Sequence, residues 1–349
     1  MLSVGYYKLK SFVQRRFYGM LDKKIILITD KNEKIEYADI SNRNLEGNNT
    51  FSTLTISNAI KNIVKDFEIF TDTHLFLQNV ENYKNDIIFP MKYGYNAPDS
   101  KSIIPGICEG ANLKYVGADD YAHMICNDKY TAKLFSKEFG IKTAPSILFR
   151  KPMDLLSVKN QLSLLNPPFV IKPNFGGGST GISEHNVCLN YEEAAQLIIK
   201  LYSFHNMPIL AEEYIPGEEV EMILVGSKKE VIFSEEVQLI MDNKEYFDTE
   251  IWGYETKKID DSSIDFKMSS FIPESDIQKI HSLFMSFEKI EFMRVDGRMY
   301  KGQFHLIELS PDCYLGDDCA FYYAFAHKGY TLSQMFEFLI LNSLNHYQL

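Results

Sequence analysis

The stretch from Phe169 to Ser183 constrains the fold more than any other part of the sequence. An apolar run at its start ends on Lys172 and is stopped by Pro173, and a glycine-rich loop follows around Ser179. The run indicates a buried strand, and the glycines allow a loop whose backbone N–H groups point toward one centre, which suits phosphate oxygens. With the ammonium group of Lys172 beside it, the loop predicts a site for a nucleoside triphosphate.

Two other glycine motifs fit this loop less well. The P-loop places Gly-Lys-Ser/Thr at the start of a helix, whereas here the lysine precedes the glycines and no helix is indicated after them. Gly177 to Gly181 also matches the G-x-S-x-G pattern of serine hydrolases, which requires a helix after the serine. Residues 182–186 do not begin a convincing helix. A flexible hairpin tip is the remaining alternative for the loop taken alone.

The composition restricts the classes of function that remain. With 349 residues, of which 45% are hydrophobic and 24% charged, the chain has the composition of a soluble protein of two or three domains. Its formal net charge of −11 disfavours nucleic acid or an anionic membrane as a partner, because neither is attracted to a negative protein. An anionic ligand therefore needs a local site of positive charge.

Neither the cysteines nor the N-terminal segment indicates a secreted or membrane protein. The five cysteines are scattered without a C-x-x-C pair, so we expect neither zinc nor disulfides, and a reducing cytoplasm is the simplest location. Residues 1–21 lack the apolar centre of a signal peptide, and no run approaches the 18 apolar residues of a membrane span. We expect this segment to form a helix packed on the body, with an amphipathic surface helix as the alternative.

Hydrophobic periodicity predicts a chain of mixed helices and strands. Helices are expected over 56–67, 128–139, 190–203, 273–287 and from 331 onward. Strands are expected over 24–29, 68–70, 86–89, 169–172, 209–214, 218–225 and 230–236, followed by a hairpin of 292–300 and 303–309. Residues 242–268 are polar and poorly periodic, which predicts a loop or lid. The early alternation of strands and helices predicts a small α/β domain that ends near residue 117.

Glutamates gather where a nucleotide would need hydrogen-bond acceptors. Glu212 and Glu213 end one expected strand, and Glu219 lies near the start of the next, after the turn at Pro216-Gly217. A glutamate can accept a hydrogen bond from the adenine amino group or from the ribose hydroxyls. A solvated acidic edge strand is the alternative for these residues alone.

The expected hairpin after residue 292 carries a second set of charged residues. Alternation places Arg294 and Asp296 on one face of the first strand, and the turn at Lys301-Gly302 brings Glu308 nearly opposite Asp296. Two facing carboxylates repel unless a cation lies between them, and Mg²⁺ favours such oxygen ligands together with substrate phosphates. Arg294 could then stabilise negative charge in a transition state. A structural Arg–Asp ion pair is the alternative.

Taken in order, these motifs resemble those of the ATP-grasp superfamily and, within it, the D-alanine–D-alanine ligases. The matching stretches are 105–117, 126–133, 170–173, the glycine loop, 212–219, 294–296, 308–311 and 329–334. The resemblance implies a three-domain ATP-grasp fold of the α/β (α+β) class, in which a small N-terminal parallel-sheet domain is followed by two α+β domains that sandwich ATP. The implied domains are 1–117, 118–212 with the glycine loop, and 213–349 with the metal site.

The resemblance also implies a role for each matched residue on the nucleotide. Lys129 and Lys172 correspond to the two lysines that contact the α- and β-phosphates, and the loop that includes Gly177, Gly178 and Ser179 corresponds to a flap over the phosphates. Glu212 corresponds to the residue beside the adenine amino group. Tyr214 or its neighbours Glu213 and Ile215 correspond to residues that line the base, and Glu219 corresponds to the ribose ligand.

At the reaction centre, the resemblance implies that Asp296, Glu308 and Ser310 hold two Mg²⁺ ions. Arg294 corresponds to the arginine that stabilises the tetrahedral intermediate, and Lys172 and Ser179 complete the implied catalytic set. In the family, a carboxylate attacks the γ-phosphate to give an acyl phosphate, and an amine then displaces phosphate to form an amide.

Several positions depart from the family pattern. Ser310 stands where the third metal ligand is usually asparagine, and the glutamate that holds the first substrate's amino group has no match near residues 51–57. The flap serine that partners it falls on Gly178, and the first domain's His-Gly segment is replaced by residues 89–94. Substrate-facing residues of the lid have only nearby candidates, of which Lys257 is one and Asp248 and Lys258 are others.

The segment after the hairpin departs most. Tyr314 takes the position of a glycine whose N–H lies at the reaction centre, and Cys319 takes that of a hydroxyl that binds the acceptor's carboxylate. Asp312, Asp317 and Asp318 add negative charge, which would repel an acceptor carboxylate. We therefore expect an acceptor other than D-alanine, either a cationic amine or an amino acid recognised in another way, with Tyr314, Asp317, Asp318 and Lys257 as candidate substrate residues.

The sequence thus predicts a cytoplasmic ATP-grasp ligase that joins a small carboxylate to an amine, with ATP and Mg²⁺ as cofactors. Nucleic acid and membrane partners are not expected, and a homodimer is possible because related ligases are often dimers. Two alternatives keep the same fold: a ligase that acts on a carrier-protein thiol, and a catalytically silent ATP-binding module. A structural protein with an acidic face is the third.

Overall fold

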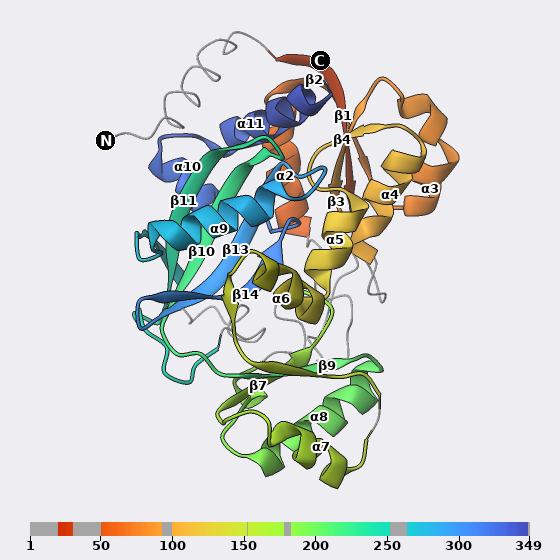
Figure 1. Cartoon of the computed structure of the whole chain (residues 1–349). Coiled ribbons are helices and arrows are strands. Elements are labelled where there is room, and N and C mark those ends of the chain that lie inside the picture. The colour runs from red at the N-terminus through yellow and green to blue at the C-terminus, as the bar shows by residue number, and fades with distance from the viewer. Residues whose placement is uncertain are drawn as a thin grey trace.

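The computed structural model describes residues 20–30, 50–92, 100–151, 153–177, 183–251 and 264–347. Within these residues the strands form three β-sheets (Figure 1). The first and third sheets lie together, and the second sheet forms a separate lobe with helices and a core of its own. The expected N-terminal helix over 1–21 lies almost entirely outside the described residues.

The first sheet is parallel, with strand order β2-β1-β3-β4. Its strands are β1 (Leu21–Thr29), β2 (Val64–Phe70), β3 (Ile87–Met91) and β4 (Lys114–Tyr115), and its connections hold α2 (Thr50–Lys61), α3 (Thr73–Gln78), η1 (Val80–Tyr83), η2 (Ser100–Ser102) and α4 (Ile103–Gly110). In β1, Ile25 and Leu27 face one core while Ile26 and Ile28 face another. Burial on both faces explains its unbroken apolar sequence.

The expected helix over 56–67 was wrong at both ends. Helix α2 begins at Thr50 and ends at Lys61, and Val64 to Phe67 open strand β2 instead. Ile56, Ile60 and Val64 satisfy helical spacing, but β-branched Val64 starts the parallel pairing with β1. The apolar spacing alone does not distinguish a helix from a helix followed at once by a strand.

The second sheet is antiparallel and carries the lysine strand. Its order is β6-β9-β7-β8, formed by β6 (Ser146–Phe149), β9 (Ile209–Glu213), β7 (Phe169–Pro173) and β8 (Val187–Cys188). Helices α7 (Leu155–Leu162) and α8 (Tyr191–His205) share a core with these strands. The predicted strand ending near Lys172 is confirmed, as is the helix start at Asn190, whose side chain accepts from the N–H of Glu193.

The third sheet is the largest of those described, with strand order β12-β11-β10-β13-β14-β5. Its strands are β12 (Ile264–Met268), β11 (Glu230–Met241), β10 (Glu218–Ser227), β13 (Phe292–Tyr300), β14 (Gln303–Ser310) and β5 (Lys142–Thr143). One core lies under α9 (Glu274–Met285), and the other lies under α10 (Ala320–His327) and α11 (Leu332–His346). The second core also includes first-sheet residues such as Phe89, whose ring contacts Phe336.

The expected loop over 242–268 was partly wrong, because 264–268 form β12 and pair with β11. Strand β12 alternates half-buried and exposed residues, a weak pattern that is typical of an edge strand. The expected hairpin is confirmed: Tyr300 pairs with Gln303, and both Lys301 and Gly302 adopt positive φ. The capping box at Thr331 and Gln334 that opens α11 is also confirmed.

Helices α5 (Asp120–Asn127) and α6 (Lys129–Glu138) precede the second sheet in sequence but pack on the third. Asp119 and Asp128 cap them, and Gly140 ends α6 with a φ of +72°, as the sequence predicted. In Figure 1, α6 lies between the third sheet and the lobe of the second sheet. The division of the chain at residues 117/118 and 212/213 stays a prediction.

Candidate nucleotide and metal site

The β13–β14 hairpin gathers four predicted residues on one face. Arg294 pairs in register with Ser310, and Asp296 pairs with Glu308. Directly opposed residues of an antiparallel pair point to the same side of the sheet. The prediction that Glu308 lies opposite Asp296 is therefore confirmed.

Arg294 is bound to Asp296 within this face. Its Nε and Nη2 atoms donate to the two carboxylate oxygens of Asp296 at 2.7 Å each, and its Nε also lies 3.6 Å from Glu221 Oε1. The structural Arg–Asp ion pair, which is the alternative explanation for this hairpin, is thus present. Burial raises the pKa of Asp296, and the nearby Glu308 adds to this, while Arg294 opposes it.

The oxygen donors at the hairpin fit a divalent cation. Asp296 and Glu308 face each other and repel, and Ser310 adds a hydroxyl beside them. Carboxylate and hydroxyl oxygens are suitable Mg²⁺ ligands when phosphates complete the coordination. In the described part of the chain, no three His, Cys, Asp or Glu side chains gather in a way that could hold a metal ion.

Lys129 joins the hairpin to the glycine loop. Its ammonium group donates to the carbonyl of Gly176 and lies 3.6 Å from Glu308 Oε1. Burial would raise the pKa of Glu308, but the positive charges of Lys129, Lys101, Lys172 and Arg294 lower it. The loop, both predicted lysines and the hairpin carboxylate are therefore close enough to interact. Gly177 is described, whereas the predicted residues Gly178 and Ser179 lie outside the described residues.

Asn174 fixes the start of the loop against helix α6, and the sequence analysis missed it. This fully buried residue accepts from the N–H of Tyr130 at 3.0 Å and donates to Asp128 at 2.9 Å, while the N–H of Lys129 donates to its carbonyl. An amide side chain directly after Pro173 was the available signal, since asparagine commonly bonds to nearby backbone. Its contacts hold Lys129 in place beside the loop.

Glu212 of β9 lies between Lys172 of the neighbouring strand β7 and Lys133 of helix α6. Its carboxylate oxygens lie 2.7 Å from Lys133 Nζ and 2.5 Å from Lys172 Nζ, and all three side chains are buried. Burial alone would raise the pKa of Glu212, but the two ammonium groups lower it to about 2. The sequence analysis missed Lys133, although its position four residues after Lys129 places both on one helix face. These contacts leave the predicted adenine and phosphate roles untested.

The other predicted nucleotide residues surround the turn between β9 and β10. Glu213 accepts from the backbone and side-chain N–H groups of Asn166 at 2.8 and 3.0 Å. Tyr214 donates to the carbonyl of Glu250 at 2.7 Å, and Arg298 binds both Glu219 and the carbonyl of Ile215. The turn itself requires glycine, since a Cβ at Gly217 would lie 2.0 Å from the carbonyl oxygen of Met299. Arg298 was not identified from the sequence.

The segment after the hairpin contacts α2 and η2, which lie in the connections of the first sheet. Tyr314 lies over Gly316, and its hydroxyl group is 3.1 Å from the hydroxyl of Ser52. Asp312 forms an ion pair with Lys101 at 2.7 Å, so its charge is compensated within the protein. Asp317 and Asp318 are exposed. Lys257 lies outside the described residues, as does Lys258, while Asp248 donates its N–H to Glu250.

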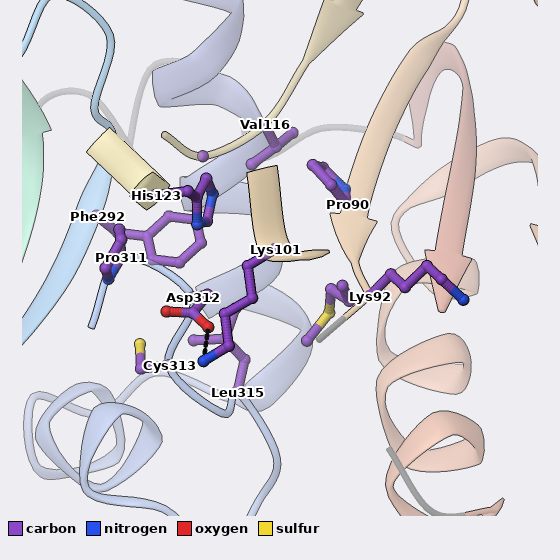
Figure 2. Close-up of a pocket in the computed structure, with 12 residues that line it drawn as sticks. Pro90, Lys92, Lys101, Val116, His123, Phe292, Pro311, Asp312, Cys313 and Leu315 are labelled. Atoms are coloured by element: carbon purple, nitrogen blue, oxygen red, sulfur yellow. Dashed lines mark ion pairs between the residues drawn. The ribbon is translucent and has the colours of Figure 1, made fainter. Parts of the chain in front are cut away.

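A small pocket opens between the first and third sheets (Figure 2). It holds about 20 Å³, enough for one water molecule, and is lined by the end of β3, helix α5, the start of β13 and the segment after β14. Its polar residues include Lys92, Lys101, His123 and Asp312, with the Lys101–Asp312 pair at its centre in Figure 2. Burial lowers the pKa of His123 to about 4, so its ring is neutral at pH 7.

Comparison with known proteins identifies the family to which this arrangement belongs. The family model described as the D-ala D-ala ligase C-terminus matches residues 135–341, which is more than half of the chain. The chain belongs to this family. The match covers Lys172, the glycine loop, Glu212 and the hairpin, and it leaves out Lys129, Lys133 and the first sheet.

Curated relatives within this D-alanine–D-alanine ligase group are distant. The chain is 28% identical over 199 residues to D-alanine–D-alanine ligase A of Salmonella typhimurium, covering 57% of this chain and 51% of that protein. It is 27% identical over 243 residues to the D-alanine–D-alanine ligase of Acetivibrio thermocellus, covering 67% and 61%. The aligned part thus spans about half to three fifths of these relatives' length.

Solved structures of ligases share the fold of most of the chain. The ligase from Bacillus anthracis complexed with ATP superposes with a TM-score of 0.69 at 16% identity, covering 93% of this chain and 99% of that one. The VanG D-Ala:D-Ser ligase from Enterococcus faecalis gives 0.68 at 20%, covering 92% and 99%. These likenesses confirm the predicted ATP-grasp fold. Among the described residues, no helix is both long and apolar enough to cross a membrane.

Proposed function

We propose that this family member is an ATP-dependent ligase that joins a carboxylate to an amine through an acyl phosphate. The observation that carries the proposal is the position of Lys129, whose ammonium group contacts the Gly176 carbonyl and lies 3.6 Å from Glu308. One cation thereby links the loop expected over the phosphates to a carboxylate expected to hold Mg²⁺. A triphosphate bound there would meet positive charge on one side and metal-binding oxygens on the other.

On the nucleotide, Lys129 and Lys172 would contact phosphate oxygens under the glycine loop. Lys172 is already bound to Glu212, but Lys133 holds the same carboxylate at 2.7 Å. Because Lys133 compensates Glu212, Lys172 can turn toward a phosphate without leaving a buried carboxylate unpaired. The backbone around Tyr214 and Ile215, with Glu212 and Glu213, would border the base, and Glu219 would accept from the ribose hydroxyls.

At the reaction centre, Asp296, Glu308 and Ser310 would hold two Mg²⁺ ions. Bound Mg²⁺ would neutralise phosphate charge. A substrate carboxylate oxygen attacks the γ-phosphorus and ADP leaves. An amine nitrogen then attacks the acyl carbon, phosphate leaves, and the nitrogen loses its proton. Arg294 lies between Asp296 and Glu221, where its guanidinium can stabilise the oxyanion of the second step.

We further propose that the acceptor is not D-alanine. Cys319 is buried and its sulfur bonds within the protein, accepting from the N–H of Tyr322 and lying 3.2 Å from the Gly316 carbonyl. It is therefore engaged in capping helix α10. Asp317 and Asp318 stand exposed directly before it, and two carboxylates there would repel an acceptor carboxylate but attract a cationic amine. The compensated charge of Asp312 does not contribute to this repulsion.

A catalytically silent ATP-binding module remains the second candidate, because Arg294 occupies both oxygens of Asp296 and serine stands at position 310. Both candidates predict a thermal shift with MgATP. They differ when the full chain is mixed with MgATP, hydroxylamine and a panel of small acids. The ligase gives phosphate release and a hydroxamate with at least one acid, whereas the silent module binds ATP and gives neither.

The acceptor is then identified with the acid that was found. D-Alanine, other amino acids and polyamines are compared as amines, and the amide product is measured by mass spectrometry. Efficient formation of D-alanyl-D-alanine would remove the proposal about the acceptor and leave the ligase intact. A protein that shows no shift with MgATP would contradict both candidates.

A further inference from the structure

Arg298 connects the elements that border the predicted nucleoside site. It lies on β13 directly opposite Glu219 of β10, and its side chain is almost completely buried. Its guanidinium donates to Glu219, to the hydroxyl of Tyr214, and to the carbonyls of Ile215 and Glu250. A single side chain thus binds the end of β9, the start of β10 and the segment after β11.

Its contact with Glu219 is one-sided. The Nε and Nη2 atoms of Arg298 lie 3.2 and 3.0 Å from the same carboxylate oxygen, Oε2. Among the described residues, no group donates a hydrogen bond to the other oxygen, Oε1. The carboxylate of Glu219 is only partly exposed, with 14% of its side chain accessible. Arg298 therefore fixes one oxygen and leaves the other as an oriented acceptor.

Aromatic rings hold the guanidinium in turn. Its central carbon lies 4.9 Å from the ring centre of Tyr214 and 5.1 Å from that of Phe247. Stacking on aromatic faces suits a planar guanidinium and does not suit an ammonium group in the same way. The position of Glu219 Oε1 therefore depends on the arginine fork, and not only on the presence of a positive charge.

We propose that Arg298 is a positioning residue that orients Glu219 toward the sugar of the nucleotide and so makes this protein select ribose over 2′-deoxyribose. The inference rests on the proposed function, in which Glu219 accepts from the ribose hydroxyls. A carboxylate held at one oxygen discriminates against a sugar without the 2′-hydroxyl, because the oriented acceptor is then left without its donor.

The test compares MgATP with Mg-2′-deoxyATP binding to the full chain by titration calorimetry. We expect wild-type protein to bind ATP about 10-fold more tightly than 2′-deoxyATP, as for one hydrogen bond to a charged group. Arg298→Lys keeps the charge but loses the fork, and should reduce this preference to about twofold or less by weakening ATP binding alone. Lys267→Met, an exposed change on β12 of the same sheet, should leave both affinities unchanged.

A second variant separates positioning from folding. Glu219→Gln should also lose the ribose preference, and adding Arg298→Lys to it should change the preference no further, as for two residues that act as one unit. Equal weakening of both nucleotides in Arg298→Lys, or an unchanged preference, would overturn the inference while leaving the ligase proposal standing. Failure of the wild-type chain to bind ATP would remove both.

Discussion

Two buried ion clusters with opposite charge balance lie in adjacent parts of the molecule. In the first, Lys133 and Lys172 share Glu212, so positive charge is in excess. In the hairpin, Arg294 lies with the carboxylates of Asp296 and Glu221, and Glu308 faces Asp296, so negative charge is in excess. One cluster is completed by an anion and the other by a cation. In the proposed function, a magnesium–triphosphate complex would supply both, and Lys129 would contact it between the loop and the hairpin.

The two clusters also differ in how far their side chains are buried. This difference predicts which cluster contributes to folding stability and which contributes to ligand binding. The Glu212 cluster has side chains that are at most 7% exposed, whereas Arg294 and Glu308 are 19% and 24% exposed. A buried charge that loses its partner costs several kcal/mol, while a partly exposed one is relieved by water. Changes at the first cluster should therefore affect folding, and changes at the hairpin should affect chemistry.

The largest effect is expected for Glu212→Gln. This change leaves Lys133 and Lys172 buried together without a carboxylate, and should lower the free energy of unfolding by about 3–5 kcal/mol. Urea denaturation followed by circular dichroism measures it. The matched control is Glu213→Gln, where the neighbouring, less buried glutamate accepts from the neutral Asn166. A loss below about 1 kcal/mol for Glu212→Gln would contradict the assignment of this cluster to stability.

A compensating change tests the same point. Lys133→Met combined with Glu212→Gln removes one ammonium group together with the carboxylate charge, so the remaining repulsion disappears. We expect this double variant to be more stable than Glu212→Gln alone, since replacing a buried ion pair by groups of similar volume is often neutral. If the double variant is the less stable of the two, repulsion between the lysines is not the cause of the loss.

At the hairpin, Glu308→Gln should act in the opposite way. It removes a carboxylate that repels Asp296 but attracts Lys129 at 3.6 Å, so the two effects oppose each other and the free energy of unfolding should stay within about 1 kcal/mol of wild type. Turnover in the hydroxamate assay should fall roughly 100-fold or more, because a proposed metal ligand is lost. Calorimetry of ATP binding at increasing Mg²⁺ supplies a second measurement, in which the Mg²⁺ requirement should increase. Persistent turnover would mean that the hairpin is not the metal site.

Lys172→Ala distinguishes the two lysines of the first cluster. Glu212 keeps Lys133 as a partner in this variant, so the fold should persist, but one charge-assisted phosphate contact is lost. We expect ATP affinity to fall roughly 10- to 100-fold, which corresponds to one hydrogen bond to a charged group. Lys159→Ala, which breaks an ion pair on the surface of the same lobe, is the control. Equal ATP affinity in wild type and Lys172→Ala would count heavily against the proposed phosphate site.

The sequence predicted the local parts of both clusters but not how they meet. Alternation over Arg294 and Asp296 and the Lys301-Gly302 turn were sufficient to place Glu308 nearly opposite Asp296. The observed pairing also depends on a register shift between Asp296 and Gly297, because the turn register alone would set Ile307 opposite Asp296. The sequence around Lys133 and Arg298 does not indicate which residues they pair with. Their partners, Glu212 and Glu219, lie about 80 residues away in the sequence. Such long-range ion pairs form only when whole helices and strands pack against one another.

The elements that were predicted wrongly fail for a related reason. Val64 satisfies a helical face with Ile56 and Ile60, yet its strand pairing with β1 decides its conformation. The pocket in Figure 2 is likewise built from six segments, so no single stretch of sequence indicates that His123, Lys101 and Asp312 lie together. Hydrophobic periodicity predicts helices and strands, but it does not predict which distant residues lie next to them in the fold.

His123 provides the most specific test, because its ring is buried and neutral and lies among charged groups. Burial lowers its pKa to about 4, Asp312 and Asp120 oppose this, and Lys101 and Lys289 add to it. Below its unfolded value near 6.5, the unfolded chain binds a proton that the folded chain does not, so stability is lost as the pH falls from about 6.5 to 4. The contribution is about 1.4 kcal/mol per pH unit within this window. Carboxylates titrate in part of the same range, so the quantity to compare is the difference between wild type and His123→Gln. Wild type should lose stability more steeply by this amount, and parallel pH profiles would mean that the ring of His123 is already charged in the folded protein.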